Sequence, residues 1–397
     1  MNPNIAKLQR YPFEKLAALK NDCTPPPDLP HIALSIGEPK HAAPDFVAAS
    51  LLQHIDGLAR YPNSRGVDDL RQAIQKWLVQ RYDLGTTELS HEKHILPLNG
   101  TREGLFAIAQ CLIDSDAKPR VLMPNPFYQI YEGAALLAGA DPYFMHCLQE
   151  NGFLPDLDAV PADVWQACQL VYICSPGNPT GAVLSVDYLQ RLIDLADIWS
   201  FSIVADECYA EVYSSDAAPV GLLQACATLG RNDFKRCLVM HSLSKRSNLP
   251  GLRSGFVAGD AELIDAFFRY RTYHGCAMSL QTQHASIATW QDEQHVIQNR
   301  ALYKEKFDAV LEILAPIMDV QAPDAGFYLW PRTPIDEVEF AQKLFIQENV
   351  TVLPGSFLSR EAGGMDPGKD RVRIALVAEL QECLESARRI KKFVESL

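Results

Sequence analysis

A lysine follows a run of hydrophobic residues in the segment Ser242-Leu243-Ser244-Lys245. The run predicts a buried strand of a parallel sheet, and such strands end at the crevice where α/β proteins bind ligands. Partly dry surroundings lower the pKa of a lysine amine, which would make Lys245 a competent Schiff-base nucleophile. The hydroxyls of Ser242 and Ser244 and the guanidinium of Arg253 would suit a phosphate ester beside it. Taken alone, the segment also fits a solvated lysine in a polar loop.

A carboxylate ends a second hydrophobic run at residues 202–206, and a tyrosine follows three positions later. An acid such as Asp206 at the end of a strand can keep a heterocyclic nitrogen protonated, as a pyridinium electron sink requires. Tyr209 could hydrogen-bond a phenolic oxygen on the same ring. The alternative for Asp206 is a helix N-cap, where aspartate is common.

Three further segments carry polar or aromatic groups next to predicted strands or helices. Residues 175–181 (SPGNPTG) contain two prolines and two glycines, which predict an irregular loop that presents the Asn178 amide. Residues 99–104 (NGTREG) open an apolar helix, whose free N–H groups and positive dipole end could bind a phosphate. Tyr128, within residues 125–131, could stack on a planar ring. Each segment alone also fits an ordinary loop or helix start.

The elements that must position these residues alternate between hydrophobic, β-rich runs and helical periodicity. This pattern is typical of a parallel sheet wrapped by helices. The runs that predict buried strands are residues 120–124, 169–174, 202–206, 236–242 and 255–259. Between the second and the third, apolar side chains recur at helical spacing behind Ser185, which predicts a capped helix over residues 185–200.

The pattern changes after about residue 295, which indicates a second lobe. A charged helix is expected over residues 300–314, and a last helix over 379–397. Short hydrophobic runs lie between them at residues 326–331, 350–354 and 371–376. Residues 22–30 (DCTPPPDLP) predict a stiff connector behind an N-terminal arm.

The composition is that of a globular protein of 397 residues, 48% hydrophobic and 21% charged. Its 36 basic and 49 acidic residues give a net charge of −13, which repels phosphate backbones and anionic lipid surfaces. No hydrophobic run approaches the about 18 residues of a membrane span, and residues 1–11 lack the apolar core of a signal peptide. We therefore expect a cytoplasmic protein that binds neither nucleic acid nor membranes. The ten cysteines, without a C-x-x-C pair, fit buried free thiols better than disulfides or zinc.

The lysine, the aspartate, the SPGNPTG turn and the NGTREG helix start occur together in one order and spacing. In this combination the chain resembles, over essentially its whole length, the class I and II aminotransferases of fold type I, which use pyridoxal 5′-phosphate. The resemblance implies an α/β fold with a large domain, whose mainly parallel sheet is wrapped by helices, and a smaller α/β domain. We expect an N-terminal arm and part of the small domain over residues 1–44, a large cofactor-binding domain over 45–295 and a small C-terminal domain over 296–397.

The resemblance also implies roles for single residues. Lys245 would bind the cofactor aldehyde as a Schiff base, Asp206 would pair with the pyridinium nitrogen, and Tyr209 would contact the ring O3′. These three are the expected catalytic residues. The remaining expected cofactor ligands in the same subunit are Gly100, Thr101, Arg102, Tyr128, Asn178, Ser242, Ser244 and Arg253. No metal is implied.

Substrate binding is expected at Gly37, Asn178 and Arg373. Arg373, in the run RVRIAL, matches the arginine that binds the substrate α-carboxylate, and Arg371 is the alternative in that run. Tyr61, in the segment YPNSRG, matches a tyrosine that reaches the cofactor phosphate of the neighbouring subunit. The resemblance thus implies a homodimer with composite active sites.

Within the family, the stretches YPFEKL, SIGEPKH and SKRSNLPGLRSGFVAG resemble N-succinyl-diaminopimelate aminotransferases of bacterial lysine biosynthesis. Such an enzyme moves the amino group of glutamate to N-succinyl-2-amino-6-oxopimelate and releases 2-oxoglutarate. Both substrates carry a distal carboxylate, which calls for a second cation or several donors. The candidates in segments that form the cleft are Lys40, Arg65 and Arg246. Each of them could equally be a solvated surface cation.

Two alternatives share the cofactor residues: an aminotransferase of the aspartate, alanine or aromatic type, and a C–S β-lyase that uses pyridoxal phosphate. Release of pyruvate and ammonia from cystathionine would favour the lyase. A transcription regulator built on this fold would need a DNA-binding module ahead of it. The aminotransferase-like segments begin by Tyr11, and the net charge is −13, so a regulator is not expected.

Overall fold

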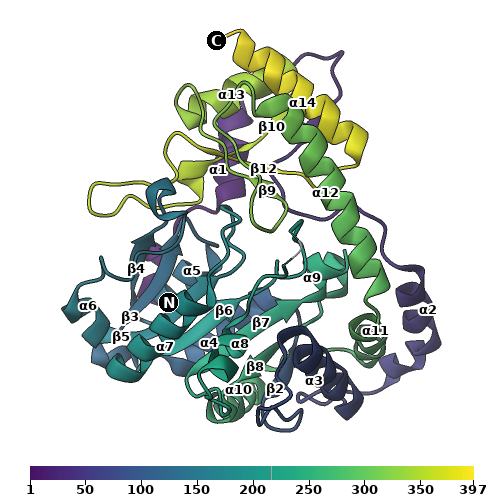
Figure 1. Ribbon diagram of the computed structural model, residues 1–397, viewed down its shortest axis with the longest axis vertical. Coiled ribbons are helices and arrows are strands. Elements are labelled where there is room, and N and C mark those ends of the chain that lie inside the picture. The colour runs from purple at the N-terminus through teal and green to yellow at the C-terminus, as the bar shows by residue number, and fades with distance from the viewer. Residues whose placement is uncertain (216) are drawn as a thin grey trace.

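A seven-stranded sheet forms the centre of the larger part of the protein, the large lobe, in the lower half of Figure 1. The computed structural model describes residues 1–215 and 217–397. The strands of this sheet are β2 (Ile95–Leu98), β3 (Arg120–Asn125), β4 (Asp141–His146), β5 (Cys168–Cys174), β6 (Ser202–Asp206), β7 (Cys237–Ser242) and β8 (Gly255–Gly259). Their order is β2-β8-β7-β6-β5-β3-β4. Strands β4, β3, β5, β6 and β7 run parallel, whereas β8 is antiparallel to both β7 and β2.

Alternate residues of the strands face two hydrophobic cores, one on each face of the sheet. Val171 and Ile203 face the core shared with α3, α7, α8 and α11, while Tyr172 and Val204 face the core shared with α4, α5 and α10. The helices of the large lobe are α2 (Asp45–Gln53), α3 (Asp68–Tyr82), α4 (Thr101–Leu112), α5 (Ile130–Leu137), α6 (Ala162–Ala167), α7 (Val186–Trp199), α8 (Leu222–Thr228), α9 (Leu243–Arg246), α10 (Ala261–His274) and α11 (Leu280–Gln291). Because helices cover both faces, the central strands are hydrophobic throughout.

The predicted α/β fold with a mainly parallel sheet is confirmed, and the five predicted strands lie within one residue of β3, β5, β6, β7 and β8. The predicted helix over residues 185–200 is α7, and Ser185 caps it by accepting from the Tyr188 N–H at 3.2 Å. The antiparallel direction of β8 was not expected. Residues 243–254 leave β7 and enter β8 at the same end of the sheet, so that β8 runs back beside β7, whereas a parallel strand would need a crossover to the opposite end.

The smaller lobe, at the top of Figure 1, combines two small sheets with four helices. Its strands are β1 (Ile32–Ala33), β9 (Tyr328–Leu329), β10 (Val350–Thr351), β11 (Leu353–Pro354) and β12 (Val372–Ala375), and its helices are α1 (Pro12–Lys20), α12 (Gln294–Leu314), α13 (Glu337–Glu348) and α14 (Leu380–Glu395). Strand β1 pairs with β10 in parallel, and β12 lies between β11 and β9 in an antiparallel sheet. Residues 12–33 therefore join the small lobe, whereas residues 3–7 contact α5 of the large lobe and residues 45–53 belong to the large lobe.

Short 3-10 helices complete the element list: η1 (Pro3–Lys7), η2 (Ile55–Ala59), η3 (Ser115–Ala117), η4 (Gln149–Asn151), η5 (Pro250–Leu252) and η6 (Gly355–Phe357). Helix α12 begins six residues before its predicted start, because Val296 and Asn299 are buried and extend its inner face. It runs from the large lobe up into the small one (Figure 1). The expected boundary between residues 295 and 296 falls in its first turn, and the domain boundaries stay a prediction.

Within residues 1–215 and 217–397, no helix combines the length and the apolar character needed to cross a membrane. All ten cysteines are free thiols. Cys147, Cys168, Cys226, Cys237 and Cys383 are buried, and the other five are partly buried.

Candidate active site

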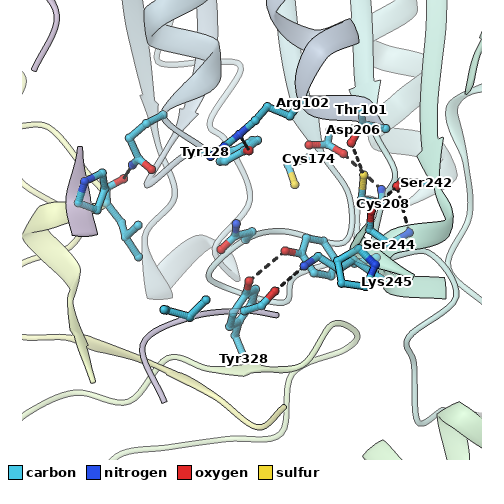
Figure 2. A pocket seen from close by; sticks show the side chains of 18 of the residues that line it. Thr101, Arg102, Tyr128, Cys174, Asp206, Cys208, Ser242, Ser244, Lys245 and Tyr328 are labelled. Atoms are coloured by element: carbon cyan, nitrogen blue, oxygen red, sulfur yellow. Dashed lines mark hydrogen bonds between the residues drawn. The ribbon is translucent and has the colours of Figure 1, made fainter. Parts of the chain in front are cut away.

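A cavity of about 380 Å³ opens at the carboxyl ends of β5, β6 and β7 and is lined from both lobes (Figure 2). Parallel strands end at the same edge of a sheet. Residues 243–254 lie at that edge too, because β7 ends there and the antiparallel β8 begins there. The expected site residues that line the cavity are Gly37, Thr101, Arg102, Tyr128, Asn178, Asp206, Tyr209, Ser242, Ser244, Lys245, Arg253 and Arg373. Gly100 adjoins the cavity through Arg253.

Lys245 is held just beyond the end of β7. The turn of helix α9 follows this strand directly, with Ser242 as its N-cap. The Lys245 Nζ donates to the Gly37 carbonyl oxygen and lies 5.3 Å from the centre of the Phe327 ring. The pKa of Lys245 is lowered to about 8, mainly because the amine is buried. An appreciable fraction of the amine is therefore neutral, and hence nucleophilic, near neutral pH.

Asp206 ends strand β6 with its carboxylate buried. Its Oδ2 accepts a hydrogen bond from the Tyr131 hydroxyl at 2.8 Å, and its Oδ1 accepts from the Cys208 N–H at 3.3 Å. Burial raises the pKa of Asp206, because the charged form loses its hydration. A cationic group placed against this carboxylate would stabilise its ionised form. The geometry therefore suits a protonated ring nitrogen.

A cradle for an anion lies at the start of α4. Gly100, the N-cap residue, has φ of +81° and ψ of 155° and offers no side chain to the first helical turn, whose N–H groups are left free to bind an anion. A Cβ at Gly100 would overlap the guanidinium of Arg253. Ser242 and Ser244 hydroxyls lie 2.9 Å apart in the same part of the cavity. This combination of N–H groups, hydroxyls and a cation fits a phosphate ester.

Arg373 is buried on strand β12 and faces the cavity from the small lobe. Its Nη1 donates to the Asn178 Oδ1 at 3.1 Å, and its Nη2 donates to the Ser35 carbonyl at 2.7 Å. Its Nε finds no hydrogen-bond partner among the described residues. Arg371, by contrast, donates to the Trp330 carbonyl at 2.9 Å and does not line the cavity. Arg373 is thus the arginine of this run that a substrate carboxylate can reach.

Tyr328 of strand β9 is a further residue of the cavity, and its hydroxyl lies next to both Tyr209 and Gly37. The Tyr209 and Tyr328 hydroxyls lie 3.0 Å apart, and a Cβ at Gly37 would overlap the Tyr328 hydroxyl. Sequence reasoning missed Tyr328 as a site residue, as it missed Tyr131, Cys174, Cys208 and Tyr11. Signals were available for three of them: Tyr131 stood three positions after Tyr128, Cys208 stood between Asp206 and Tyr209, and Cys174 ended a predicted strand. Tyr11 and Tyr328 come from segments whose closeness to the site depends on the fold.

Four expected residues do not join the cavity of their own subunit. Arg246 is wrong as a candidate for the distal carboxylate, because it is buried 4.9 Å from the Trp290 ring and bonded to Glu293. Lys40 forms an ion pair with Glu382 at 3.4 Å on the surface. Arg65 donates to the Glu92 carbonyl at 2.7 Å and stacks over Phe268. Tyr61 is fully exposed, so that its role toward a neighbouring subunit stays a prediction.

A profile of known protein families, described as aminotransferase class I and II, matches residues 30–390. The chain belongs to the class I and II aminotransferases. An LL-diaminopimelate aminotransferase of Dehalococcoides mccartyi is 31% identical to it over 368 residues, 91% of each chain. One of Maridesulfovibrio salexigens is 30% identical over 395 residues, covering 98% of this chain and 97% of the relative.

Solved structures agree with this family. A crystal structure of an aminotransferase from Neisseria meningitidis is 46% identical to this aminotransferase, with a TM-score of 0.95 and coverage of 99% of this chain and all of the other. The aminotransferase AspB from Helicobacter pylori is 34% identical, with a TM-score of 0.90, and covers 98% of this chain and all of its own.

The cofactor of this aminotransferase family is pyridoxal 5′-phosphate, a pyridine aldehyde with a phosphate ester. The described residues fit it. The Gly100 cradle would take the phosphate, and the buried Asp206 carboxylate would face the pyridine nitrogen. Tyr128 and Cys208 line the cavity beside the expected position of the ring, and the Lys245 amine would face the aldehyde. These assignments are proposals for the individual residues.

Proposed function

We propose that this aminotransferase takes its amino group from glutamate and transfers it to N-succinyl-2-amino-6-oxopimelate, in the formation of diaminopimelate and lysine. One observation carries the proposal. In the described part of the chain, the cavity is lined by four cations and by one carboxylate, Asp206. The cations are Lys245, Arg253, Arg373 and Arg102. Lys245 and Arg253 are assigned to the cofactor and Arg373 to the α-carboxylate of the substrate. Arg102 is then available for a second carboxylate of the substrate.

The relatives support the diaminopimelate skeleton and also supply a second candidate substrate, LL-diaminopimelate itself. The distal end of that compound carries a carboxylate and a free ammonium group. The succinylated acceptor keeps this carboxylate, has a neutral amide in place of the ammonium group and adds a terminal carboxylate. Asp206 is the single acid that lines the cavity among the described residues, and it is assigned to the ring nitrogen. The excess of cations therefore favours the succinylated acceptor.

When bound, the cofactor supplies an electron sink conjugated with the substrate Cα. Lys245, whose amine has a lowered pKa, would remove the Cα proton and deliver it to the cofactor carbon. Asp206 would keep the pyridine nitrogen protonated, while Tyr209 and Asn178 would hydrogen-bond the ring oxygen. Arg373 would orient the α-carboxylate through a charge-assisted pair. Both substrates would use these groups in turn, so that we expect ping-pong kinetics.

The test is a panel of amino donors and keto acids with the purified protein. We expect the highest kcat/KM for glutamate with N-succinyl-2-amino-6-oxopimelate, and no turnover in Lys245→Ala. A higher kcat/KM for LL-diaminopimelate with 2-oxoglutarate would establish the second candidate instead. Preference for oxaloacetate, pyruvate or an aromatic keto acid would assign another aminotransferase type. Release of pyruvate and ammonia from cystathionine would identify a β-lyase.

We also propose that the protein acts in the cytoplasm as a homodimer with composite sites. Exposed hydrophobic side chains around η2 support the dimer, because they gather in one stretch that ends at the exposed Tyr61. They are Leu52, Ile55 and Leu58, which are 72%, 51% and 67% exposed. A second subunit that covered this stretch would bury these three side chains. Tyr61 of the first subunit would then lie near the cavity of the second.

A further inference from the structure

The side chain of Arg102 takes a different direction from the other cofactor ligands of α4. Figure 2 shows it extending toward Tyr128, on the opposite side of Asp206 from Ser242 and Ser244. Its Nε donates to the Tyr128 hydroxyl at 2.6 Å, and its Nη2 donates to the Tyr11 hydroxyl at 2.6 Å. Three segments distant in sequence therefore converge on one guanidinium.

The direction of these hydrogen bonds leaves the hydroxyl hydrogens of Tyr11 and Tyr128 without an acceptor. A guanidinium can only donate, so both phenol oxygens accept from Arg102 and their own hydrogens must point elsewhere. Among the described residues neither the Tyr11 nor the Tyr128 hydroxyl donates to an acceptor, and Arg102 has no carboxylate partner. Two hydroxyls and a cation thus present donors to the cavity they line. Such a set binds an anion, and a carboxylate can accept from all three.

The other charged groups of the cavity are already engaged. Arg373 is fixed by Asn178 and Ser35 where the α-carboxylate is expected, and Arg253 adjoins Gly100 in the phosphate cradle. Lys245 donates to the Gly37 carbonyl and is assigned to the cofactor aldehyde, and Asp206 accepts from Tyr131. Arg102 is the remaining cation, and none of the three sequence-derived candidates for the distal carboxylate lines this cavity.

We propose that Arg102, with the hydroxyls of Tyr11 and Tyr128, binds the distal carboxylate of the substrates and so selects dicarboxylic ones. The proposal rests on the proposed function, in which glutamate and the acceptor each carry such a group. It replaces the cofactor-binding role expected for the Arg102 side chain. The Arg102 main-chain N–H stays in the first turn of α4 and keeps its place in the cradle.

The test compares glutamate with alanine in the amino-donor half-reaction, followed by the absorbance change of the holoenzyme. Arg102→Gln should lower the selectivity, kcat/KM for glutamate divided by that for alanine, by about ten- to hundredfold. Tyr11→Phe should lower it by a smaller factor, because one neutral donor is lost. Arg388→Gln removes a solvent-exposed arginine of α14 and should leave the selectivity unchanged. Arg102→Lys, which retains the charge, should fall between the wild-type protein and Arg102→Gln.

Equilibrium binding separates recognition from chemistry. Glutarate and valerate have the same number of carbons and differ in the second carboxylate, so their dissociation constants report on that group alone. The wild-type holoenzyme should bind glutarate at least tenfold more tightly than valerate, and Arg102→Gln should abolish the difference. A folded Arg102→Gln and Arg102→Lys that keep the wild-type selectivity would overturn the role of Arg102 while the proposed function stands. A wild-type protein that does not favour glutamate over alanine would overturn the proposed function itself.

Discussion

Lys245 and Asp206 stand at neighbouring strand ends, where burial favours the neutral form of each group. It lowers the pKa of the Lys245 amine to about 8 and raises the pKa of the Asp206 carboxyl. Hydrogen bonds from Cys208 and Tyr131 act in the opposite sense on Asp206. A protonated pyridine ring would add the missing positive charge. Each side chain therefore has the protonation state required for its proposed role: a neutral amine for attack and, once the ring is bound, a charged carboxylate.

The lowered pKa of Lys245 has a measurable consequence in the apoenzyme. Only the neutral amine attacks an aldehyde, so that the association rate of pyridoxal phosphate should rise with pH and level off above about 8. Stopped-flow absorbance between pH 6.5 and 10.5 measures this rate. Nα-acetyl-lysine, which has only the side-chain amine, is the control under the same conditions and should titrate near the ordinary lysine pKa of 10.5. A midpoint near 10.5 in the protein would mean that burial does not control this amine.

Arg373 and Arg371 form a matched pair for a second prediction. Arg373→Lys should raise the KM for the amino donor and for the keto acid alike, because both bind through one α-carboxylate site. Loss of a bidentate charged contact is worth about 1.5–3 kcal/mol, or roughly ten- to hundredfold in kcat/KM. Arg371→Lys should have little effect on kinetics, since its partners are Trp330 and Gln149 outside the cavity. A larger defect in Arg371→Lys than in Arg373→Lys would reverse the assignment.

Among the elements, the start of α4 depends on a backbone conformation that glycine adopts readily. Gly100→Ala should raise the dissociation constant for pyridoxal phosphate by about tenfold or more, because φ of +81° strains alanine and its Cβ displaces Arg253. Gly230→Ala is the control for backbone strain outside the site, because Gly230 has φ of +72° and no atom within 4 Å of its Cβ position. It should reduce thermal stability without changing cofactor affinity. Equal cofactor affinity in both variants would mean that Gly100 is not needed to bind the cofactor phosphate.

The elements also show which features a sequence can predict. Strands β3, β5, β6, β7 and β8 were predictable because burial on both faces requires a continuous hydrophobic run. Strand β2 was missed because Pro97 interrupts its pattern at the sheet edge, and edge strand β4 was missed because most of its residues are only partly buried. The spacing of motifs also located the cavity residues at the strand ends.

What the sequence could not predict depends on contacts between distant segments. Arg246 stands next to Lys245, yet its guanidinium packs against Trp77 and Trp290, which are far from it in the chain. Arg102 meets Tyr11 only because α1 of the small lobe packs near α4 of the large lobe. Local patterns identify residue types that can do chemistry, whereas their final partners follow from the packing of the whole chain.

For the whole molecule, the exposed Tyr61 makes a prediction about assembly. Tyr61→Ala and Lys245→Ala subunits, each inactive alone, should regain about a quarter of wild-type activity when mixed and allowed to exchange. In half of the dimers, one site then contains an intact Lys245 from one subunit and an intact Tyr61 from the other. Activity after mixing is the measurement, with subunit exchange verified by differently tagged chains. If Tyr61 serves its own subunit, no exchange will restore activity.

Helix α12 connects the two lobes as a rigid lever. Its 21 residues span about 30 Å, so a tilt of about 5° at one end would shift the other by about 3 Å. That shift is as long as the hydrogen bond between Arg373 and Asn178, which joins a small-lobe strand to a large-lobe loop. Binding of a carboxylate by Arg373 therefore depends on the angle between the two lobes. A rotation of a few degrees is enough to move the guanidinium out of hydrogen-bonding distance.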